Sequence, residues 1–406
     1  MTRSVVAIVR CPDYRPESLD EAMERLQEFI GGFGGLIKPK EAVFLKINHL
    51  GNHKTDLAIN THPELVASFA RSISGITTNV TVADGLDTPD SSPFETTGFS
   101  RVCREAGLEL VNFCRQGYVS VTLDNPYCMG RVPIATIARE AGFVVTVPKL
   151  KTHMLTLVTG AVKNNYGYLP HEVRLRLHRE HIIPADFAGA VTDVFAACKP
   201  GLTVMDAIDA LEGSGPSTGG RPRHLGLLIA GTDAVAVDAV SSAVVGLDPM
   251  EVATTRLAHE RGYGVGDLSQ IEVVGSSIEE VRCRNFAKPV NQVFLGSLLD
   301  RMPRSMSRGL ARVFRVTRQW PEVSPERCTG CGMCATHCPQ DTIDMTGGKA
   351  WINYDECIAC FCCLEYCPSN AIRPRRSVAG GVLSKCVRGV ERGARAAGKL
   401  FLRRRR

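Results

Sequence analysis

CTGCGMCATHCP at residues 328–339 returns as CIACFCCLEYCP at residues 357–368. Both stretches follow the spacing C-x2-C-x2-C-x3-C-P, and every cysteine of the second lies 29 residues after its counterpart in the first. Three closely spaced thiolates on one loop, with a fourth held away beside a proline, are typical of cysteines that bind [4Fe–4S] clusters. The duplication predicts two such clusters in a small C-terminal unit.

The two cysteine runs are expected to exchange their last ligands. In the bacterial-type ferredoxin run, the fourth cysteine of each loop binds the cluster of the other loop. Cys362 lies outside the spacing and is expected to be a packed thiol, with a ligand exchange against Cys363 left open. We therefore assign one cluster to Cys328, Cys331, Cys334 and Cys367, and the other to Cys357, Cys360, Cys363 and Cys338.

Two other uses of these cysteines are disfavoured. Structural zinc takes four ligands from paired C-x2-C units, which these triple runs are not. Disulfides need an oxidising compartment. Residues 1–10 hold only a short apolar run at 5–9, which is typical of a first strand and not of a secretory signal. A cytoplasmic iron–sulfur protein is therefore expected.

The chain of 406 residues is long enough for two or three domains. Within the ferredoxin unit, Gly347-Gly348 between two alternating segments predicts a hairpin. No apolar run reaches the roughly 18 residues that suggest a membrane-spanning helix. We expect an α/β domain at 1–290, a basic helical linker at 291–320, the ferredoxin unit at 321–373 and a basic tail at 374–406.

Both basic segments show helical periodicity. Basic amphipathic helices of this kind either lie on an anionic membrane surface or pack their apolar faces on the protein. We keep both alternatives, and the first would place the chain peripherally at the inner face of the membrane. Nucleic acid is disfavoured because no aromatic side chains interleave the charge. Net charge is +6 over 301–320 and +11 over 373–406, against −6 over 1–300 and −5 over 321–372.

The N-terminal part alternates strand-like and helix-like segments. This alternation predicts an α/β domain with a mostly parallel sheet and helices on its faces. The expected helices are 16–30, 63–74, 94–106, 184–197 and 234–245. The expected strands are 5–9, 43–47, 80–83, 108–113, 143–147, 203–205, 225–230 and 271–274.

Polar residues gather just after several of these strands, where α/β folds build their sites. One group is dense in cationic and titratable side chains, which suit a small anionic substrate and supply candidate acids. From it we select Lys151, His153, Lys163 and His178 as catalytic candidates. Its alternative is a solvated basic loop.

A second set of polar and glycine residues is predicted to bind a cofactor or substrate. The glycine-rich segment 213–220 either brings backbone N–H groups to a phosphate or forms a plain surface turn. Asp206, Asp209 and Glu212 either bind a hard cation or act as caps and solvated acids. The selected binding residues are Lys46, Asn48, Asn164, Gly213 and Gly215.

The order of these motifs resembles a known family. Five motifs, taken in order along the chain, resemble those of Domain of Unknown Function family 362. They are Lys46-x-Asn48, Pro148-x-Leu150-Lys151-Thr152-His153, Lys163-Asn164, Glu212-Gly213-x-Gly215-Pro216 and Asp233-x-Val235-x-Val237-Asp238. Members are often fused to a two-cluster ferredoxin, so the resemblance implies an iron–sulfur protein without naming a reaction. A fainter similarity is to lactate-racemase-like proteins, in which a His, a cofactor-bearing Lys and a further His follow one another as do His153, Lys163 and His178 or His181.

Three hypotheses follow. The leading one is an iron–sulfur oxidoreductase, in which electrons from an unidentified ferredoxin, flavodoxin or reductase pass through two [4Fe–4S] clusters to a small anionic substrate in the α/β domain. The second is a non-enzymatic electron-transfer or metallocentre-assembly protein. The third is a racemase or isomerase with a metal-containing cofactor.

Overall fold

The computed structural model describes residues 3–88, 90–289 and 319–376. A ten-stranded sheet runs in the order β12-β1-β11-β10-β7-β2-β3-β4, with β8 paired to β10 and β9 to β8. Most neighbours are parallel, while β11 is antiparallel to β1 and β10, and β9 to β8. The predicted α/β domain with a mostly parallel sheet is confirmed. The strands are β1 (Ser4–Arg10), β2 (Val43–Ile47), β3 (Val80–Asp84), β4 (Glu109–Asn112), β7 (Phe143–Val147), β8 (Lys149–His153), β9 (Leu157–Thr159), β10 (Leu202–Gly213), β11 (Gly220–Gly231) and β12 (Ile271–Gly275).

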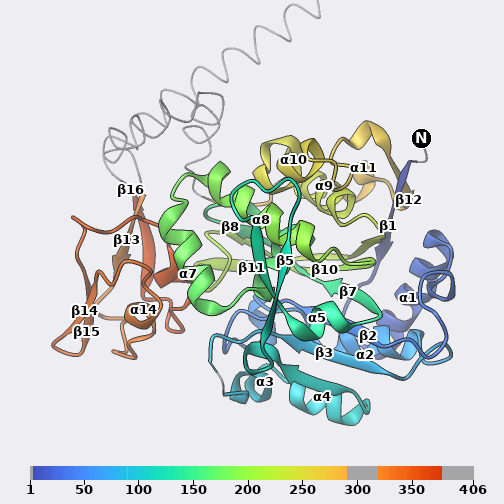
Figure 1. The fold of residues 1–406 in the computed structure, drawn as a ribbon, viewed down its shortest axis with the longest axis horizontal. Helices are drawn as coiled ribbons and strands as arrows, with labels where there is room; N and C mark the ends of the chain where they lie inside the picture. Colours follow the sequence, from blue (N-terminus) through green and yellow to red (C-terminus); the bar gives the residue numbers. More distant parts are fainter. Residues whose placement is uncertain (1–2, 89, 290–318, 377–406) are drawn as a thin grey trace, which may run out of the picture.

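Helices cover both faces of the sheet because its strands bury side chains in both directions (Figure 1). In β1, Ala7 and Val9 belong to the core beneath α1 and α2, whereas Val6 and Ile8 pack with α9. Strands that are apolar on both faces are typical of buried parallel sheets. The helices are α1 (Pro16–Ile30), α2 (Pro63–Ser72), α3 (Ser92–Thr96), α4 (Phe99–Glu105), α5 (Thr136–Glu140), α6 (Ala161–Asn164), α7 (His171–Glu180), α8 (Pro184–Ala197), α9 (Ala234–Val244), α10 (Ala253–Glu260) and α11 (Ile278–Val281).

Two segments expected to be loops after strands are themselves strands. Residues 149–153 form β8, so the alternative of a solvated basic loop is wrong. The segment 206–213 continues β10 as far as Gly213, paired with β11. Both segments carry polar side chains, so their sequences lack the apolar pattern by which a buried strand is recognised. These polar side chains are buried because residues from distant segments pack over them. The predicted helix 94–106 is broken by Gly98, whose φ of 81° belongs to the left-handed region.

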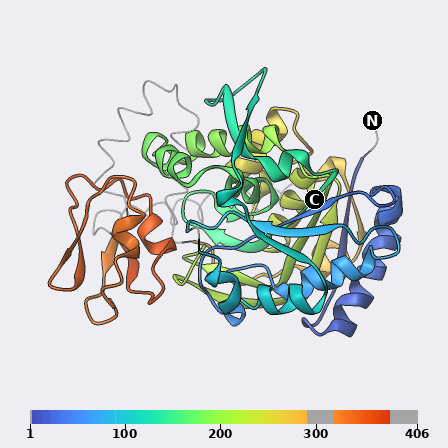
Figure 2. The same ribbon diagram turned by 60° about the horizontal axis from the view of Figure 1, so that its bottom comes forward.

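The ferredoxin unit lies at one end of the α/β domain, beside α7 (Figures 1 and 2). The hairpin predicted at Gly347-Gly348 is confirmed, since β14 pairs antiparallel with β15 around it. The outer pair, β13 with β16, joins the two ends of the unit. Its elements are β13 (Gln319–Val323), α14 (Met333–Thr336), β14 (Ile343–Thr346), β15 (Lys349–Ile352), α15 (Cys362–Glu365) and β16 (Ile372–Arg376).

The 29-residue repeat extends to the backbone. Gly330 and Gly332 have positive φ angles of 75° and 76°, and so do their counterparts Ala359 and Phe361, at 54° and 65°. Left-handed backbone costs a non-glycine residue roughly 1–2 kcal/mol. The second loop keeps this conformation without glycine, which indicates that the path around the cysteines dictates it.

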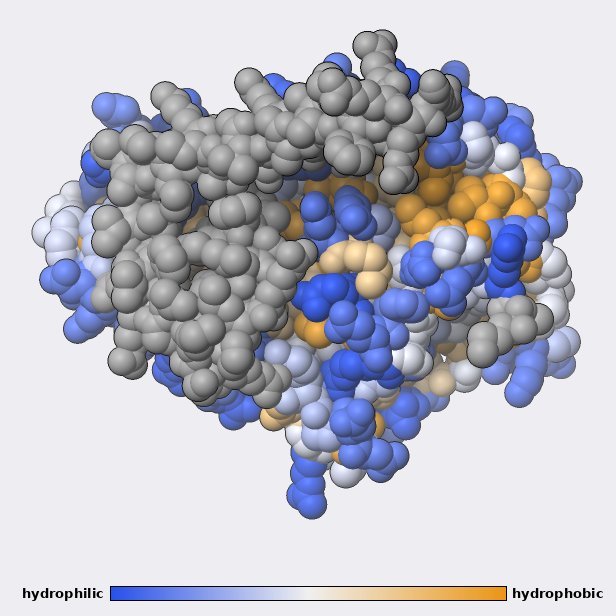
Figure 3. Space-filling view, turned by 90° about the horizontal axis from the view of Figure 1, so that it is seen from above, coloured by the Kyte–Doolittle hydropathy of each residue, from blue (hydrophilic) through white to orange (hydrophobic). Residues whose placement is uncertain are grey.

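Two features of the structure are relevant to the expected membrane contact, namely the helix lengths and the apolar surface. Among the described residues, no helix is long and apolar enough to cross a membrane. Seen from above, the α/β domain shows an apolar area bordered by hydrophilic residues (Figure 3). The basic helices expected at 299–315 and 383–401 lie outside the described residues.

Two glycine substitutions separate backbone strain from steric conflict in the first cysteine loop. A Cβ at Gly330 would lie 2.4 Å from the carbonyl oxygen of Gly348, whereas a Cβ at Gly332 has nothing within 4 Å. Both residues have positive φ, so Gly332→Ala is the matched control. We expect Gly330→Ala to lower iron content by about four atoms per chain, and Gly332→Ala to retain it. Iron and sulfide analysis after anaerobic reconstitution measures this, and equal iron in both variants would contradict the expectation.

Candidate functional site

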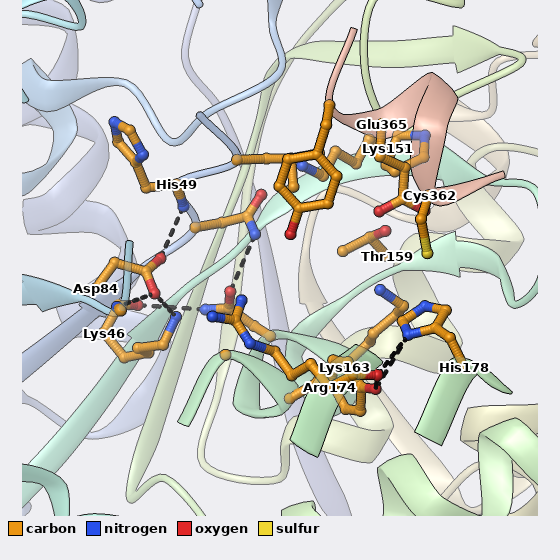
Figure 4. A pocket seen from close by; sticks show the side chains of 18 of the residues that line it. Lys46, His49, Asp84, Lys151, Thr159, Lys163, Arg174, His178, Cys362 and Glu365 are labelled. Carbon is orange, nitrogen blue, oxygen red and sulfur yellow. Dashed lines mark hydrogen bonds and ion pairs between the residues drawn. The ribbon is translucent and has the colours of Figure 1, made fainter. Parts of the chain in front are cut away.

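A pocket lies where β2, β8, α6 and α7 converge (Figure 4). The ferredoxin unit supplies one wall through Cys362 and Glu365 of α15 and Tyr366, which follows it. Figure 4 shows Cys362 and Glu365 on one side, facing Lys163 and His178 on the other. The pocket is therefore built jointly by two distant parts of the chain, residues 46–216 and residues 362–366.

The structure brings together most of the residues selected from sequence. His153 lies just behind the pocket, with its Nε2 3.2 Å from Glu365 Oε1. Gly213 and Gly215 do not line the pocket, although Pro216 does. The selected residues that line the pocket are Lys46, Asn48, Lys151, Lys163, Asn164 and His178.

Gly213 and Gly215 have backbone roles. Gly213 ends β10 at a φ of 90°, and its N–H donates to Ala287 O at 2.7 Å. A Cβ at Gly215 would lie 2.4 Å from Thr152 O, so glycine there permits a close approach to β8. Neither residue aims a free N–H group into the pocket, and the structure gives no support to a phosphate cradle there.

Each of the three acidic residues within β10 has a side-chain partner. Asp206 pairs with Lys149 at 3.0 Å, Asp209 with His224 at 2.8 Å and Glu212 with Arg221 at 2.7 Å. Throughout the described ranges, no three His, Cys, Asp or Glu side chains are gathered to hold a single metal ion. The hard-cation alternative for these acids is therefore not supported.

Lys46 is anchored at the base of the pocket. It is 1% exposed and pairs with Asp84 at 2.8 Å, and its Nζ also donates to Ile47 O at 2.7 Å. Burial lowers the pKa of Lys46 and raises that of Asp84, while their mutual attraction opposes both shifts. Asn164 Nδ2 donates to Thr146 Oγ1 at 2.8 Å, and Asn48 Nδ2 donates to Asn164 Oδ1 at 3.2 Å. These residues form a fixed polar floor.

Lys163 and Lys151 differ from Lys46 because neither has a carboxylate partner among the described residues. Lys163 Nζ lies 5.7 Å from the centre of the Tyr166 ring, and no hydrogen-bond acceptor in the described part of the chain binds it. Lys151 Nζ donates to a single acceptor, Ile59 O, at 2.8 Å. Burial, with the charge of Lys163 second, lowers the pKa of Lys151 to about 7. The pocket therefore offers positive charge for an anionic ligand.

His178 presents a lone pair to the pocket. Its Nδ1 lies 2.8 Å from Arg174 O, an acceptor only, so Nδ1 carries the hydrogen and Nε2 does not. Nε2 is buried and has no partner among the described residues. Burial lowers the His178 pKa to about 4, so the ring is neutral at pH 7. His178 can accept a hydrogen bond or a proton from a bound molecule, but it is not an acid.

His153 has the opposite tautomer. Its Nδ1 accepts from the backbone N–H groups of Leu155 and Thr156 at 3.1 and 3.3 Å, so Nε2 carries the hydrogen that faces Glu365. The contact is close, although its angles are not those of a hydrogen bond. Burial lowers the His153 pKa to about 4. Burial opposes ionisation of Glu365, while its neighbours His153, Lys163 and His178 act to lower its pKa. Because both rings are neutral at pH 7, Lys163 supplies the charge that keeps Glu365 ionised.

Asp87 joins the ferredoxin unit to α7. It accepts from Tyr366 OH and pairs with Arg174, and its Oδ1 lies 2.9 Å from His171 Nδ1. Burial opposes its ionisation, but Arg174 and His171 hold the Asp87 pKa well below its usual range. The Tyr366 ring stacks on His337 at 3.8 Å, next to the fourth cysteine of the first run. This network fixes the orientation of α15 above the pocket.

Sequence reasoning missed the residues that complete the site. Glu365, Tyr366 and Cys362 were considered only as parts of the cysteine run. Asp84 ends β3 and Asp87 lies three residues beyond it, and neither carried a motif. Their positions at the end of a strand and just beyond it were the available signal, since carboxyl ends of parallel strands share one edge of a sheet. The contribution of the ferredoxin unit had no signal in the local sequence.

The cysteines fit the crossed assignment. One small cavity is lined by Cys338, Cys357, Cys360 and Cys363, the set predicted to hold one cluster. Burial raises the pKa of the Cys334 thiol to about 11, and the charges of Cys367, Cys328 and Cys331 add to this shift. Backbone N–H groups of Ala359 and Ala371 point at Cys357 Sγ and Cys367 Sγ, at 3.4 and 3.2 Å. Such N–H···S contacts tune cluster potentials.

Comparison with known proteins agrees with this architecture. The family described as "Domain of unknown function (DUF362)" matches residues 43–243, and a 4Fe–4S dicluster domain matches residues 321–368. The chain belongs to the DUF362 family. The DUF362 match spans β2 to α9, and so includes all pocket-lining residues outside the ferredoxin unit.

Two known proteins show similarity to this DUF362 protein. It is 30% identical over 258 residues to the "Thylakoid-associated protein sll1697" of Synechocystis sp. (strain ATCC 27184 / PCC 6803 / Kazusa), covering 61% of this chain and 77% of that protein. It also resembles the lactate racemase apoprotein from Thermoanaerobacterium thermosaccharolyticum, at 12% identity and a TM-score of 0.39. That likeness covers 57% of this chain and about half, 54%, of the racemase. Nothing about the racemase is transferred at that level of similarity.

Cys362 and Cys363 form a matched pair for the cluster assignment. Cys362 lines the pocket, whereas Cys363 lines the cavity with three other predicted ligands. We expect Cys363→Ala to reduce iron from about eight to about four atoms per chain and Cys362→Ala to leave it unchanged. Iron analysis and EPR spectra of the reduced protein provide the measurement. Loss of iron from Cys362→Ala, with full iron in Cys363→Ala, would instead support the ligand exchange.

Buried histidines predict acid sensitivity. Burial lowers the pKa of His49 to about 3 and of His53, His62, His153 and His178 to about 4. Each takes up a proton on unfolding as pH falls through about 6.5, and the folded state does not, so stability falls with pH. Between pH 7 and 6 the loss is roughly 0.7 kcal/mol per histidine, or roughly 3 kcal/mol for five.

Anaerobic urea unfolding followed by circular dichroism at the two pH values measures this loss. His49→Gln should reduce the loss by roughly 0.7 kcal/mol, because glutamine does not titrate. A wild-type protein equally stable at both pH values would contradict the neutral state of these rings.

Proposed function

We propose that this protein reduces a small anionic molecule in the pocket, using electrons that pass through two [4Fe–4S] clusters. The observation that carries the proposal is the ferredoxin wall: Cys362, between two cysteines of one predicted cluster set, lines the same pocket as Lys163 and His178. Bound clusters supply single electrons at that wall. The α/β domain supplies the binding site.

The residues of the pocket divide the remaining tasks. Lys163 attracts the anion, because its ammonium group makes no direct ion pair in the described part of the chain, although the charge of Glu365 in the same pocket acts on it. Its ammonium group can also donate a proton to a molecule that gains electrons. His178 Nε2 orients the ligand by accepting a hydrogen bond. Glu365 limits the net positive charge and repels a second anion.

The exposed side of the ferredoxin unit suits electron entry. Cys331 is exposed, while Cys363 is buried. We propose that a separate redox protein, such as a ferredoxin, flavodoxin or reductase, delivers electrons to the cluster of Cys331. The non-enzymatic alternative uses the same entry side but no chemistry in the pocket, and the following experiment separates the two.

The test follows reoxidation of photoreduced protein by nitrite, sulfite, glyoxylate and fumarate under anaerobic conditions. We expect one of these anions to reoxidise the wild-type protein at least about tenfold faster than Lys163→Met, corresponding to about 1.4 kcal/mol of lost charge interaction. The control is Arg176→Met on α7, because Arg176 is exposed and pairs weakly with Glu180 at 4.0 Å. It should behave as the wild type.

The non-enzymatic alternative makes the opposite prediction. If wild type, Lys163→Met and Arg176→Met are reoxidised at the same rate by every anion, the electrons do not pass into the pocket. A carrier or assembly protein would then be the better description. Iron content of each variant must equal that of the wild type for the comparison.

A further inference from the structure

Three lysines of the sheet, one on β2 and two on β8, are almost fully buried. Lys46, Lys149 and Lys151 are 1%, 1% and 2% exposed. Lys46 is paired with Asp84 and Lys149 with Asp206. Lys151 alone of the three has no carboxylate partner within the described ranges, and its Nζ donates only to Ile59 O. Of three equally buried lysines, two are therefore neutralised by a carboxylate, and Lys151 is not.

The unpaired lysine is the one that lines the pocket. A buried ammonium group without a counter-ion costs several kcal/mol, so the amine loses its proton more easily. Burial and the positive charge of Lys163 act in the same direction and lower the pKa of Lys151 to about 7. A neutral amine carries a lone pair and is a nucleophile towards carbonyl carbon. Lys149, by contrast, is ion-paired with Asp206 and does not line the pocket.

The neighbours of Lys151 indicate what the carbonyl compound carries. Lys163 and Arg174 line the same pocket. Lys163 makes no direct ion pair in the described part of the chain, although the charge of Glu365 in the same pocket acts on it. A ligand that brings a carboxylate to Lys163 would place a nearby carbon within the pocket that Lys151 also lines (Figure 4). His178 Nε2 and Asn48 Oδ1 remain as buried acceptors without partners among the described residues.

We propose that Lys151 forms an imine with the carbonyl carbon of a small oxo-acid bound in the pocket. The Lys151 nitrogen adds to the carbonyl carbon, and the C=O bond opens to a hydroxyl group. Loss of that hydroxyl with the second hydrogen of the amine releases one water and leaves a C=N bond. The step needs no electrons. It rests on the proposed function only in that a small anion occupies this pocket.

The test traps the imine in the oxidised holoprotein. Glyoxylate is added anaerobically at pH 7 with cyanoborohydride, which reduces an imine to carboxymethyl-lysine, and the modified lysines are located by peptide mass spectrometry. Since ordinary exposed lysines are almost fully protonated at pH 7, we expect Lys151 to react roughly a hundredfold faster than exposed Lys38 and Lys54. Buried Lys149 is the matched internal control and should stay unmodified.

Two comparisons identify the ligand class. Acetaldehyde, which has the carbonyl but no carboxylate, should modify Lys151 at least about tenfold more slowly than glyoxylate, as should glyoxylate with Lys163→Met. Lys151→Arg should abolish modification at this position while retaining the wild-type iron content, which shows that the fold is intact. Modification of Lys151 no faster than of Lys38, or labelling of Lys163 in its place, would overturn the proposal. Equal rates with acetaldehyde would overturn the oxo-acid class.

This experiment and the reoxidation experiment fail independently. Trapping uses an external reductant and oxidised clusters, so it succeeds even if no electrons from the clusters reach the pocket. A positive reoxidation result without trapping at Lys151 would retain the proposed reduction and remove the imine.

Discussion

The packing of α15 against the α/β domain is the interaction on which the site depends. It buries Glu365 beside His153, and it brings Cys362 and Tyr366 to the pocket. A buried carboxylate is tolerated only near compensating positive charge, and Lys163 provides it here. Thr218 Oγ1 also donates to Cys367 O at 3.0 Å, and Leu364 lies close to Gly219. The ferredoxin unit is therefore a structural part of the pocket as well as a carrier of cysteines.

The charges around the pocket follow from which lysines find partners. Asp84 neutralises Lys46 and Asp206 neutralises Lys149. The first ion pair joins β2 to β3, and the second joins β8 to β10. Lys151 and Lys163 receive no such partner among the described residues. Their charge remains available to a ligand, and in Lys151 burial also makes the neutral amine accessible. The ion-paired lysines thus stabilise the fold, and the lysines without an ion pair are available to bind a ligand.

Much of the fold could be predicted from the sequence, and less of the site. The helices 16–30 and 184–197 and the strands 43–47 and 143–147 have the predicted bounds, because their apolar patterns depend on local periodicity. β8 was missed as a strand because its lysines and histidine are buried by distant partners. Six pocket residues were selected correctly as neighbours, since strand ends converge in α/β folds. Glu365 and Tyr366 could not be found, because domain docking leaves no local pattern.

The location of the iron tests the central claim most directly. Anomalous diffraction at the iron edge from anaerobically grown crystals would locate every cluster relative to the pocket. The account predicts two iron sites in the ferredoxin unit, one bound by Cys338, Cys357, Cys360 and Cys363 directly behind the wall that Cys362 and Glu365 form. A ferredoxin unit turned away, with both iron sites remote from Lys163 and His178, would contradict it.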